Sequence, residues 1–397
     1  MTSRRHFLST AAAGALLAPV SPFTRLSVAA NAKSGPAAPR FVFVILRGGM
    51  DGLMAVPAIG DASFAEARGP LGVFAGEALK LDSTFALHPL LPQMHQMFGR
   101  EELTVLHAVG LPYRERSHFD AQQVLESGGQ RPYELSTGWL ARALPAAGGL
   151  RAVALATAVP LVLRGPQEVD SWAPSVLPEP SMDLVARLEV LYRDDPGLGQ
   201  ALARARGLRE QPGMAANMAV PSGGSGRGAL VALARKAADF LQRGSQVAVM
   251  EMGGWDSHVN QAAPNGAASN NLRTLDAALA ALREDLLPGG TWGRTVVLVA
   301  TEFGREVAVN GNQGSDHGSG GAAFVLGGAV RGGRVLADWP GLAKKDRHEG
   351  RDLRTTTDLR AAMRGILSDH LSVARSALDQ TVLPGSAGLT PLDLLRG

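Results

Sequence analysis

The chain has 397 residues, no cysteine, 39 Lys and Arg against 36 Asp and Glu, and a formal net charge of +3 at pH 7. Without cysteine there are no disulfide bonds, thiolate metal sites or cysteine nucleophiles, so a metal ion would have to be held by Asp, Glu, His or Asn. The Lys and Arg are scattered and aromatic residues make up 5% of the chain, which gives no basis for nucleic-acid binding.

Residues 1–32 have the pattern of a twin-arginine export signal, and we exclude them from the fold. Arg4 and Arg5 precede a weakly apolar stretch at 11–20, and Ala-Asn-Ala at 30–32 has the form of a cleavage site. The apolar stretch is too short to span a bilayer, so we expect no integral membrane span in the mature chain. A chance Arg pair before a surface helix is the alternative. The signal predicts a periplasmic or extracellular protein that is exported folded.

We expect residues 33–397 to form a single domain. It begins with a linker at 33–40. The next predicted elements, in chain order, are a strand at 41–46, a helix at about 89–98, a strand at 103–108, a polar irregular stretch at 110–140, and short strands at 152–155 and 161–163.

Residues 165–228 are the least sheet-like part and are predicted to be an insertion or cap. Two helices, at about 180–194 and 198–208, lead into a mobile loop at 212–228 that is rich in Gly, Ser and Pro. Alternation then resumes with a helix at about 229–243, a strand at 246–252, a helix at about 271–287, strands at 295–301 and 322–326, and a helix at about 358–372. This alternation predicts a doubly wound α/β fold.

Short polar motifs follow three of the predicted strands directly, at residues 47–52, 253–258 and 302–305. Each strand is a uniformly apolar run, which is typical of a central strand in a covered parallel sheet. Because ligands bind outside the carboxyl ends of such strands, the polar side chains of the motifs are expected to converge. Carboxylates and an imidazole at one place suggest a metal site, with these candidate ligands: Asp51, Asp256, His258 and Glu302.

Each motif also has an ordinary structural interpretation. Asp51 can form an Asx-turn or cap a helix, and glycines around it let the backbone approach a ligand. Asp256 and His258 can stabilise a hydrogen-bonded turn. Glu302 can form an ion pair with Arg305 that orients the loop.

Residues 315–321, Ser-Asp-His-Gly-Ser-Gly-Gly, are the densest polar cluster and come immediately before an apolar strand. Asp316 and His317 are further candidate metal ligands, because a neutral imidazole oriented by its neighbours binds transition metals well. A glycine-rich surface loop with an incidental histidine is the alternative.

The candidate catalytic groups lie in residues 114–119. Ser117 is a possible nucleophile that would need activation by a base or a metal, and His118 stands beside it. Arg114 and Arg116 suit bidentate binding of phosphate or sulfate. A solvated loop is the alternative for this segment.

Other signals are negative or ordinary. The chain has no P-loop, H-E-x-x-H or G-x-S-x-G motif, which weakens the P-loop, zincin and α/β-hydrolase interpretations. Four histidines lie outside the polar motifs and are expected to be structural or exposed: His88, His107, His348 and His370.

Five motifs, in this order, resemble the DUF1501 family of exported bacterial proteins, which is distantly similar to the alkaline phosphatase/sulfatase superfamily. They are Phe-Val-Phe-Val-Ile-Leu-Arg-Gly-Gly-Met-Asp-Gly, Arg-Ser-His-Phe, Gly-Gly-Trp-Asp-Ser-His, Thr-Glu-Phe-Gly-Arg and Ser-Asp-His-Gly. The resemblance covers nearly the whole mature chain. It implies an alkaline-phosphatase-like three-layer sandwich with a central, mostly parallel sheet and a metal site at the strand carboxyl ends.

By position, the resemblance gives ligand roles to five residues: Asp51, Asp256, His258, Glu302 and His317. It makes Ser117 the nearest candidate for the Ser/Thr nucleophile. Phe303 stands where the superfamily normally has a second-site His, and Asp316 is the candidate substitute.

Two functions follow from the resemblance. The first is an exported hydrolase of phosphate or sulfate esters that depends on Zn, Mn, Mg or Ca, with a small-molecule ester or a glycan as substrate. The alternative is a degenerate, non-catalytic member that binds a carbohydrate, a peptide or another exported protein.

Overall fold

The computed structural model describes residues 37–174, 180–210 and 227–397. The expected export signal and most of the expected loop at 212–228 lie outside these ranges. The strands are β1 (Arg40–Leu46), β2 (Leu79–Lys80), β3 (Ala86–Leu87), β4 (Leu103–Gly110), β5 (Ala152–Leu155), β6 (Asp170–Ser171), β7 (Val247–Met252), β8 (Thr295–Thr301), β9 (Gly321–Leu326), β10 (Arg334–Leu336) and β11 (Thr357–Asp358). The helices are α2 (Gly52–Ala55), α3 (Phe64–Arg68), α4 (Pro92–Gly99), α5 (His118–Ser127), α6 (Trp139–Ala146), α7 (Met182–Leu191), α8 (Pro196–Glu210), α9 (Arg227–Gln242), α10 (Ala267–Leu286), α11 (Leu359–Gly365) and α12 (Arg375–Ala377).

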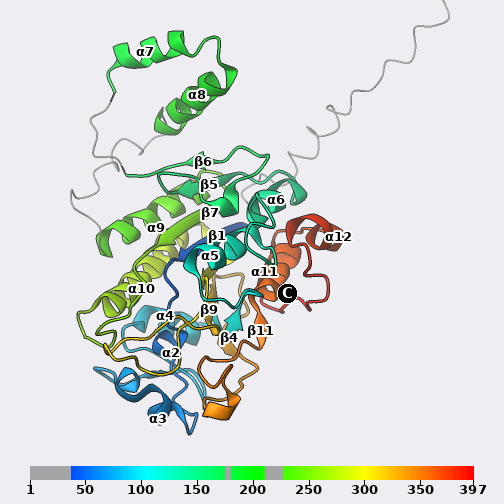
Figure 1. Cartoon of the computed structure of the whole chain (residues 1–397). Helices are drawn as coiled ribbons and strands as arrows, with labels where there is room; N and C mark the ends of the chain where they lie inside the picture. The colour runs from blue at the N-terminus through cyan, green and yellow to red at the C-terminus, as the bar shows by residue number, and fades with distance from the viewer. Residues whose placement is uncertain (1–36, 175–179, 211–226) are drawn as a thin grey trace, which may run out of the picture.

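The described residues form a nine-stranded sheet in the order β10-β4-β9-β8-β1-β7-β5-β6, with β11 also paired to β4 (Figure 1). All pairings in it are parallel except those of β9, which runs antiparallel to both β4 and β8. The carboxyl ends of β1, β4, β7 and β8 therefore lie at the same edge as the beginning of β9. This arrangement brings together loops that are far apart in the sequence.

Successive side chains of β1 point to opposite faces of the sheet, and this alternation shows how the helices cover both faces. Val42, Val44 and Leu46 belong to one hydrophobic core, which includes residues of α4, α9 and α10. Phe41, Phe43 and Ile45 belong to the other core, which includes residues of α5, α6 and α11. Because both faces of the sheet are covered by helices, the predicted three-layer α/β sandwich with a mostly parallel sheet is confirmed.

Two predictions about local structure are wrong. Residues 161–163 form a 3₁₀ turn instead of a strand, beginning after Pro160. The stretch 110–140 is not irregular throughout, because it contains α5 and the first two residues of α6. The amphipathic pattern of α5 is obscured because Gln122 and Glu126 point polar groups inward, toward other buried polar residues.

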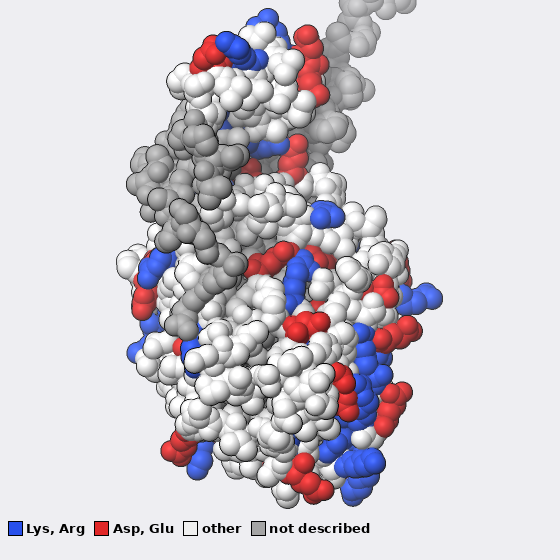
Figure 2. All heavy atoms as spheres, turned by 60° about the vertical axis from the view of Figure 1, so that its left-hand side comes forward, with Lys and Arg blue, Asp and Glu red and all other residues white. Residues whose placement is uncertain are grey.

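The expected insertion at 165–228 contributes β6 to the sheet, while α7 and α8 stand away from the body (Figure 1). Within α7 no residue is buried. On the face seen in Figure 2, charged side chains gather in groups of both signs on a largely neutral surface. None of the described helices is both long enough and apolar enough to cross a membrane.

One interhelical contact fixes the position of α4 and gives a test of the fold. The buried Asp276 of α10 accepts hydrogen bonds from the N–H groups of Gln93 (3.2 Å) and Met94 (2.8 Å), at the first turn of α4. Asp276→Ala leaves these donors without a partner, so we expect a loss of about 1–3 kcal/mol in unfolding free energy, measured by urea denaturation. Asp276→Asn keeps an acceptor and should lose less; equal losses would contradict this role.

Candidate metal centre

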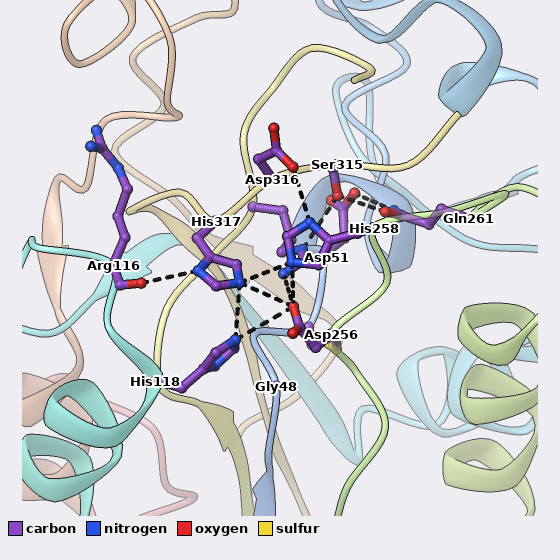
Figure 3. Close-up of polar contacts among 12 residues, drawn as sticks. Gly48, Asp51, Arg116, His118, Asp256, His258, Gln261, Ser315, Asp316 and His317 are labelled. Carbon is purple, nitrogen blue, oxygen red and sulfur yellow. Dashed lines mark hydrogen bonds and ion pairs between the residues drawn. The ribbon is translucent and has the colours of Figure 1, made fainter. Parts of the chain in front are cut away.

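Four side chains at the carboxyl edge of the sheet direct one atom each at a common point (Figure 3). His317 Nε2 lies 3.1 Å from Asp256 Oδ1, 3.0 Å from His118 Nε2 and 3.1 Å from His258 Nε2. Asp256 Oδ1 also lies 2.9 Å from His258 Nε2 and 3.4 Å from His118 Nε2. We call these four residues the His/Asp cluster. They come from the loop after β7, from the beginning of α5 and from the loop before β9.

The far side of each imidazole is held by an acceptor. His118 Nδ1 lies 2.8 Å from Glu302 Oε1, and His258 Nδ1 lies 3.0 Å from Asp316 Oδ1. His317 Nδ1 lies 3.0 Å from the carbonyl oxygen of Arg116. Carboxylates and carbonyls only accept, so each Nδ1 carries the hydrogen and donates it. In the neutral rings every Nε2 therefore presents a lone pair to the cluster.

This geometry needs a cation. Lone pairs and a carboxylate oxygen that lie 2.9–3.4 Å apart in the five pairs given above repel one another unless a proton or a metal ion lies among them. Tetrahedral zinc with bonds of about 2.0–2.1 Å places its ligands about 3.3 Å apart, which matches these separations. One ligand atom from each of His118, Asp256 and His317 lies within 4.8 Å of the others. The residues present therefore fit a bound metal ion.

The charges around the cluster keep Asp256 ionised. Burial raises the pKa of its carboxyl, but a hydrogen bond from Arg305 (2.7 Å) and the Arg305 charge lower it to about 2. The hydrogen bond to Glu302 raises the pKa of His118, whereas burial lowers the pKa of His317. The side chains remain accessible, from 22% exposed at His118 to 44% at Asp256, so a solute can reach the cluster.

Glu302 lies behind His118 instead of beside the other ligand atoms. Its Oε1 accepts from His118 Nδ1, the N–H of Gly48 (2.8 Å) and Gln122 Nε2 (2.9 Å), and its Oε2 accepts from Thr301. Both carboxylate oxygens are thus occupied, and the residue is only 1% exposed. Asp316 has the same position behind His258, where it also accepts from Asn310 (3.0 Å).

Asp51 lies outside the His/Asp cluster and binds a different set of residues. Its side chain caps α2 by accepting from the N–H of Met54 (3.1 Å), and it forms a buried ion pair with Arg68 (2.6 Å) and a hydrogen bond with Gln261 (2.5 Å). Burial raises the pKa of Asp51, but Arg68 outweighs that effect and lowers it below its usual value. Its oxygens contact none of the four cluster atoms in a hydrogen bond or ion pair.

The candidate catalytic residues flank the cluster. The guanidinium of Arg116 points away from it (Figure 3) and is bound by Asp352 (2.9 Å) and Glu349 (2.8 Å). Ser117 directly precedes α5 and makes no capping hydrogen bond through its side chain. Arg114 is exposed and has no hydrogen bond or ion pair with a described residue.

Several supporting residues were not predicted from the sequence. Gln122 and Asn310 hold the carboxylates behind the imidazoles, and Arg305 binds Asp256 instead of the expected Glu302. Phe303 packs its ring against His118 (centroids 4.7 Å apart) and His317 (5.1 Å), closing one flank of the cluster. The sequence signal for Gln122 was weak, because only its position one turn after His118 in α5 identifies it.

We expect Glu302→Gln to weaken zinc binding by about 10–100-fold, because a neutral amide orients and polarises His118 less than a carboxylate does. The measurement is chelator competition with the purified protein. Glu66→Gln, an exposed substitution on α3, is the matched control. Unchanged zinc affinity in Glu302→Gln would contradict the role given to Glu302.

Asp51→Asn separates a structural role from a ligand role. It leaves the fully buried Arg68 without its charged partner, so we expect a loss of about 3–5 kcal/mol in unfolding free energy. Zinc affinity of the folded protein should stay unchanged. A fall in affinity comparable to that of His317→Ala would show that Asp51 is a metal ligand after all.

Comparison with known proteins identifies the family. Solved structures similar to this chain include the PsFucS1 sulfatase from Pseudoalteromonas sp. (12% identity, 93% of this chain and 74% of that chain, TM-score 0.41). A second is the C-terminal periplasmic domain of EcEptC from Escherichia coli in complex with Zn (10% identity, 74% of this chain and 74% of that chain, TM-score 0.33). A third is Ps i-CgsB in complex with k-i-k-neocarrahexaose (10% identity, 88% of this chain and 75% of that chain, TM-score 0.44). Likeness at this level says nothing about activity.

No curated protein matches the sequence. The family model described as "Protein of unknown function (DUF1501)" matches residues 106–364, well over half of the chain. As the sequence motifs predicted, the chain belongs to the DUF1501 family.

Proposed function

We propose that the His/Asp cluster binds one divalent metal ion and that the protein is a metal-dependent hydrolase of phosphate or sulfate esters. The observation that supports the proposal most directly is the convergence of three Nε2 lone pairs on Asp256 Oδ1, with all three Nδ1 atoms held by acceptors. A purely structural histidine cluster would have no need of this shared orientation.

The ligand set favours zinc among Zn, Mn, Mg and Ca. Imidazole suits Zn²⁺ and other transition metals, whereas Mg²⁺ and Ca²⁺ prefer sites made of oxygen ligands. His118, Asp256 and His317 would supply three protein ligands, which is the number typical of catalytic zinc sites that leave a fourth position to water or substrate.

A bound divalent cation would supply polarisation of the ester and would favour a deprotonated nucleophile. The chain's own residues provide the rest. Tyr113, four residues before Ser117, donates a hydrogen bond to Asp120 (3.0 Å) in the first turn of α5, so a carboxylate lies close to Ser117 along the chain. Arg114, which has the charge of Asp358 near it but no hydrogen bond or ion pair with a described residue, remains available for an anionic ester, whereas Arg116 is already bound by two carboxylates.

A non-catalytic role has one observation in its favour. His258 Nε2 lies 2.9 Å from Asp256 Oδ1 and 3.1 Å from His317 Nε2, where it could close the site as a further protein ligand, and closed sites are usually structural. In this alternative the protein binds a carbohydrate, a peptide or another exported protein. For either function we propose export by the twin-arginine route, on the strength of residues 1–32 alone.

The test is turnover by the mature protein loaded in turn with Zn²⁺, Mn²⁺, Mg²⁺ and Ca²⁺, assayed on aryl phosphates, phosphodiesters and aryl sulfates. We expect turnover with zinc on at least one ester, and a fall in kcat of roughly 10³-fold or more in Ser117→Ala with its metal content unchanged. Ser376→Ala, an exposed serine at α12, is the matched control.

The outcomes separate the two functions. Stoichiometric zinc without turnover on any ester would reject the hydrolase and leave the non-catalytic alternative. Turnover that survives Ser117→Ala would retain the hydrolase and reject Ser117 as its nucleophile.

A further inference from the structure

A second cavity lies apart from the His/Asp cluster, between the loop that follows α3 and the beginning of α10. The space in it that a water-sized solute can reach is about 40 Å³, and the cavity is partly open to solvent, so a ligand seated in it can extend outward. Most of its wall is apolar, and the lining includes Met54, Leu71, Val73, Phe74, Leu90 and Pro264. The polar residues on the wall are His88, Gln261, Ser269 and Arg273.

His88 presents a hydrogen-bond donor that has no partner. Its Nδ1 accepts from the N–H of Leu90 (3.1 Å), so in the neutral ring the hydrogen is on Nε2. No described residue accepts from that Nε2, although His88 is only 6% exposed. Burial, helped by the charge of Arg273, lowers the pKa of His88 to about 4, so the ring is neutral at pH 7. Phe74 packs edge-on against it, with centroids 5.0 Å apart.

The cavity wall also carries a positive charge, that of Arg273, without a carboxylate on the wall to balance it. Arg273 is half-buried on the wall and donates to the side chain of Asn270 (3.1 Å), but it forms no ion pair with a described residue. No Asp or Glu lines the cavity. Gln261 and Ser269 already use their polar groups on Asp51, Ser315 and Ala263. The free donors of the wall are therefore His88 and Arg273, while the Ser269 hydroxyl, which donates to Ala263, can still accept.

We propose that this cavity binds a small monocarboxylate with an apolar body, such as a short-chain or arylalkyl acid. The carboxylate accepts hydrogen bonds from His88 Nε2 and from the guanidinium of Arg273, and the hydrocarbon part packs against Phe74, Leu71 and Leu90. A charged acceptor satisfies both donors and balances the half-buried cation. The cavity shares only Gln261 with the hydrogen-bonded network of the His/Asp cluster, and the proposal does not rest on the activity proposed for that cluster.

The experiment is titration calorimetry of the full mature protein with hexanoate and phenylacetate, each compared with its neutral amide, hexanamide or phenylacetamide. We expect each acid to bind at least tenfold more tightly than its amide. Arg273→Gln should remove most of that difference while leaving amide binding nearly unchanged. Arg375→Gln, an exposed arginine at the start of α12, is the matched control and should bind like the parent protein.

A second measurement does not depend on a variant that folds. In protein labelled with ¹⁵N-histidine, hexanoate should shift the Nε2–H signal of His88 in proportion to occupancy. The proposal is overturned if neither acid binds saturably at concentrations up to about 10 mM, which corresponds to binding weaker than about 3 kcal/mol. It is also overturned if amides bind as tightly as acids, or if the His88 signal does not move at saturation.

Discussion

Repulsion among four electron-rich atoms is the constraint on which the arrangement of this sheet edge depends. The Nε2 atoms of three histidines each lie 2.9–3.4 Å from one oxygen of Asp256, and acceptors on the outer side of each ring hold them there. Each imidazole is fixed by a separate acceptor, and Asp256 is fixed by Arg305. A fold does not maintain such an arrangement by packing alone, because each ring would turn away if its outer nitrogen were free.

The supports of the cluster are themselves tied into the core. Glu302 is held by the backbone of Gly48, which approaches the loop after β7 so closely that a Cβ at Gly48 would lie 2.6 Å from the nitrogen of Asp256. Gly48 also has a φ of +116°, a conformation that other residues rarely adopt. On the other side, Ser315 links Arg305 to Gln261, which binds Asp51. The His/Asp cluster and the ion pair of Asp51 with Arg68 therefore belong to one hydrogen-bonded network.

The sequence predicted where the candidate site lies better than it predicted which residues form it. Apolar runs followed by polar motifs identified the edge at which Asp256, His258 and His317 meet, because parallel strands end together. Side-chain direction within a loop leaves no such pattern, so Glu302 and Asp51 were grouped with residues that they do not contact. His118 was expected in a catalytic role, since nothing local indicates that its Nε2 meets a histidine 199 positions later. The helix α5 was not predicted for the same reason: its inward-facing polar residues bind partners that are far away in the sequence.

The long sequence separations within the cluster have a thermodynamic consequence. Its members span residues 118–317 and come together only when β4, β7 and β9 have paired, so the unfolded chain offers an ion no comparable set of ligands. Coordination of an ion would then connect three loops of the folded protein. The free energy of unfolding would increase with the concentration of free ion in the compartment. Above the dissociation constant, every tenfold rise in free ion adds about 1.4 kcal/mol to the folded state. If the proposed ion binds, the protein would resist unfolding best where the ion is abundant and would unfold more easily where it is scarce.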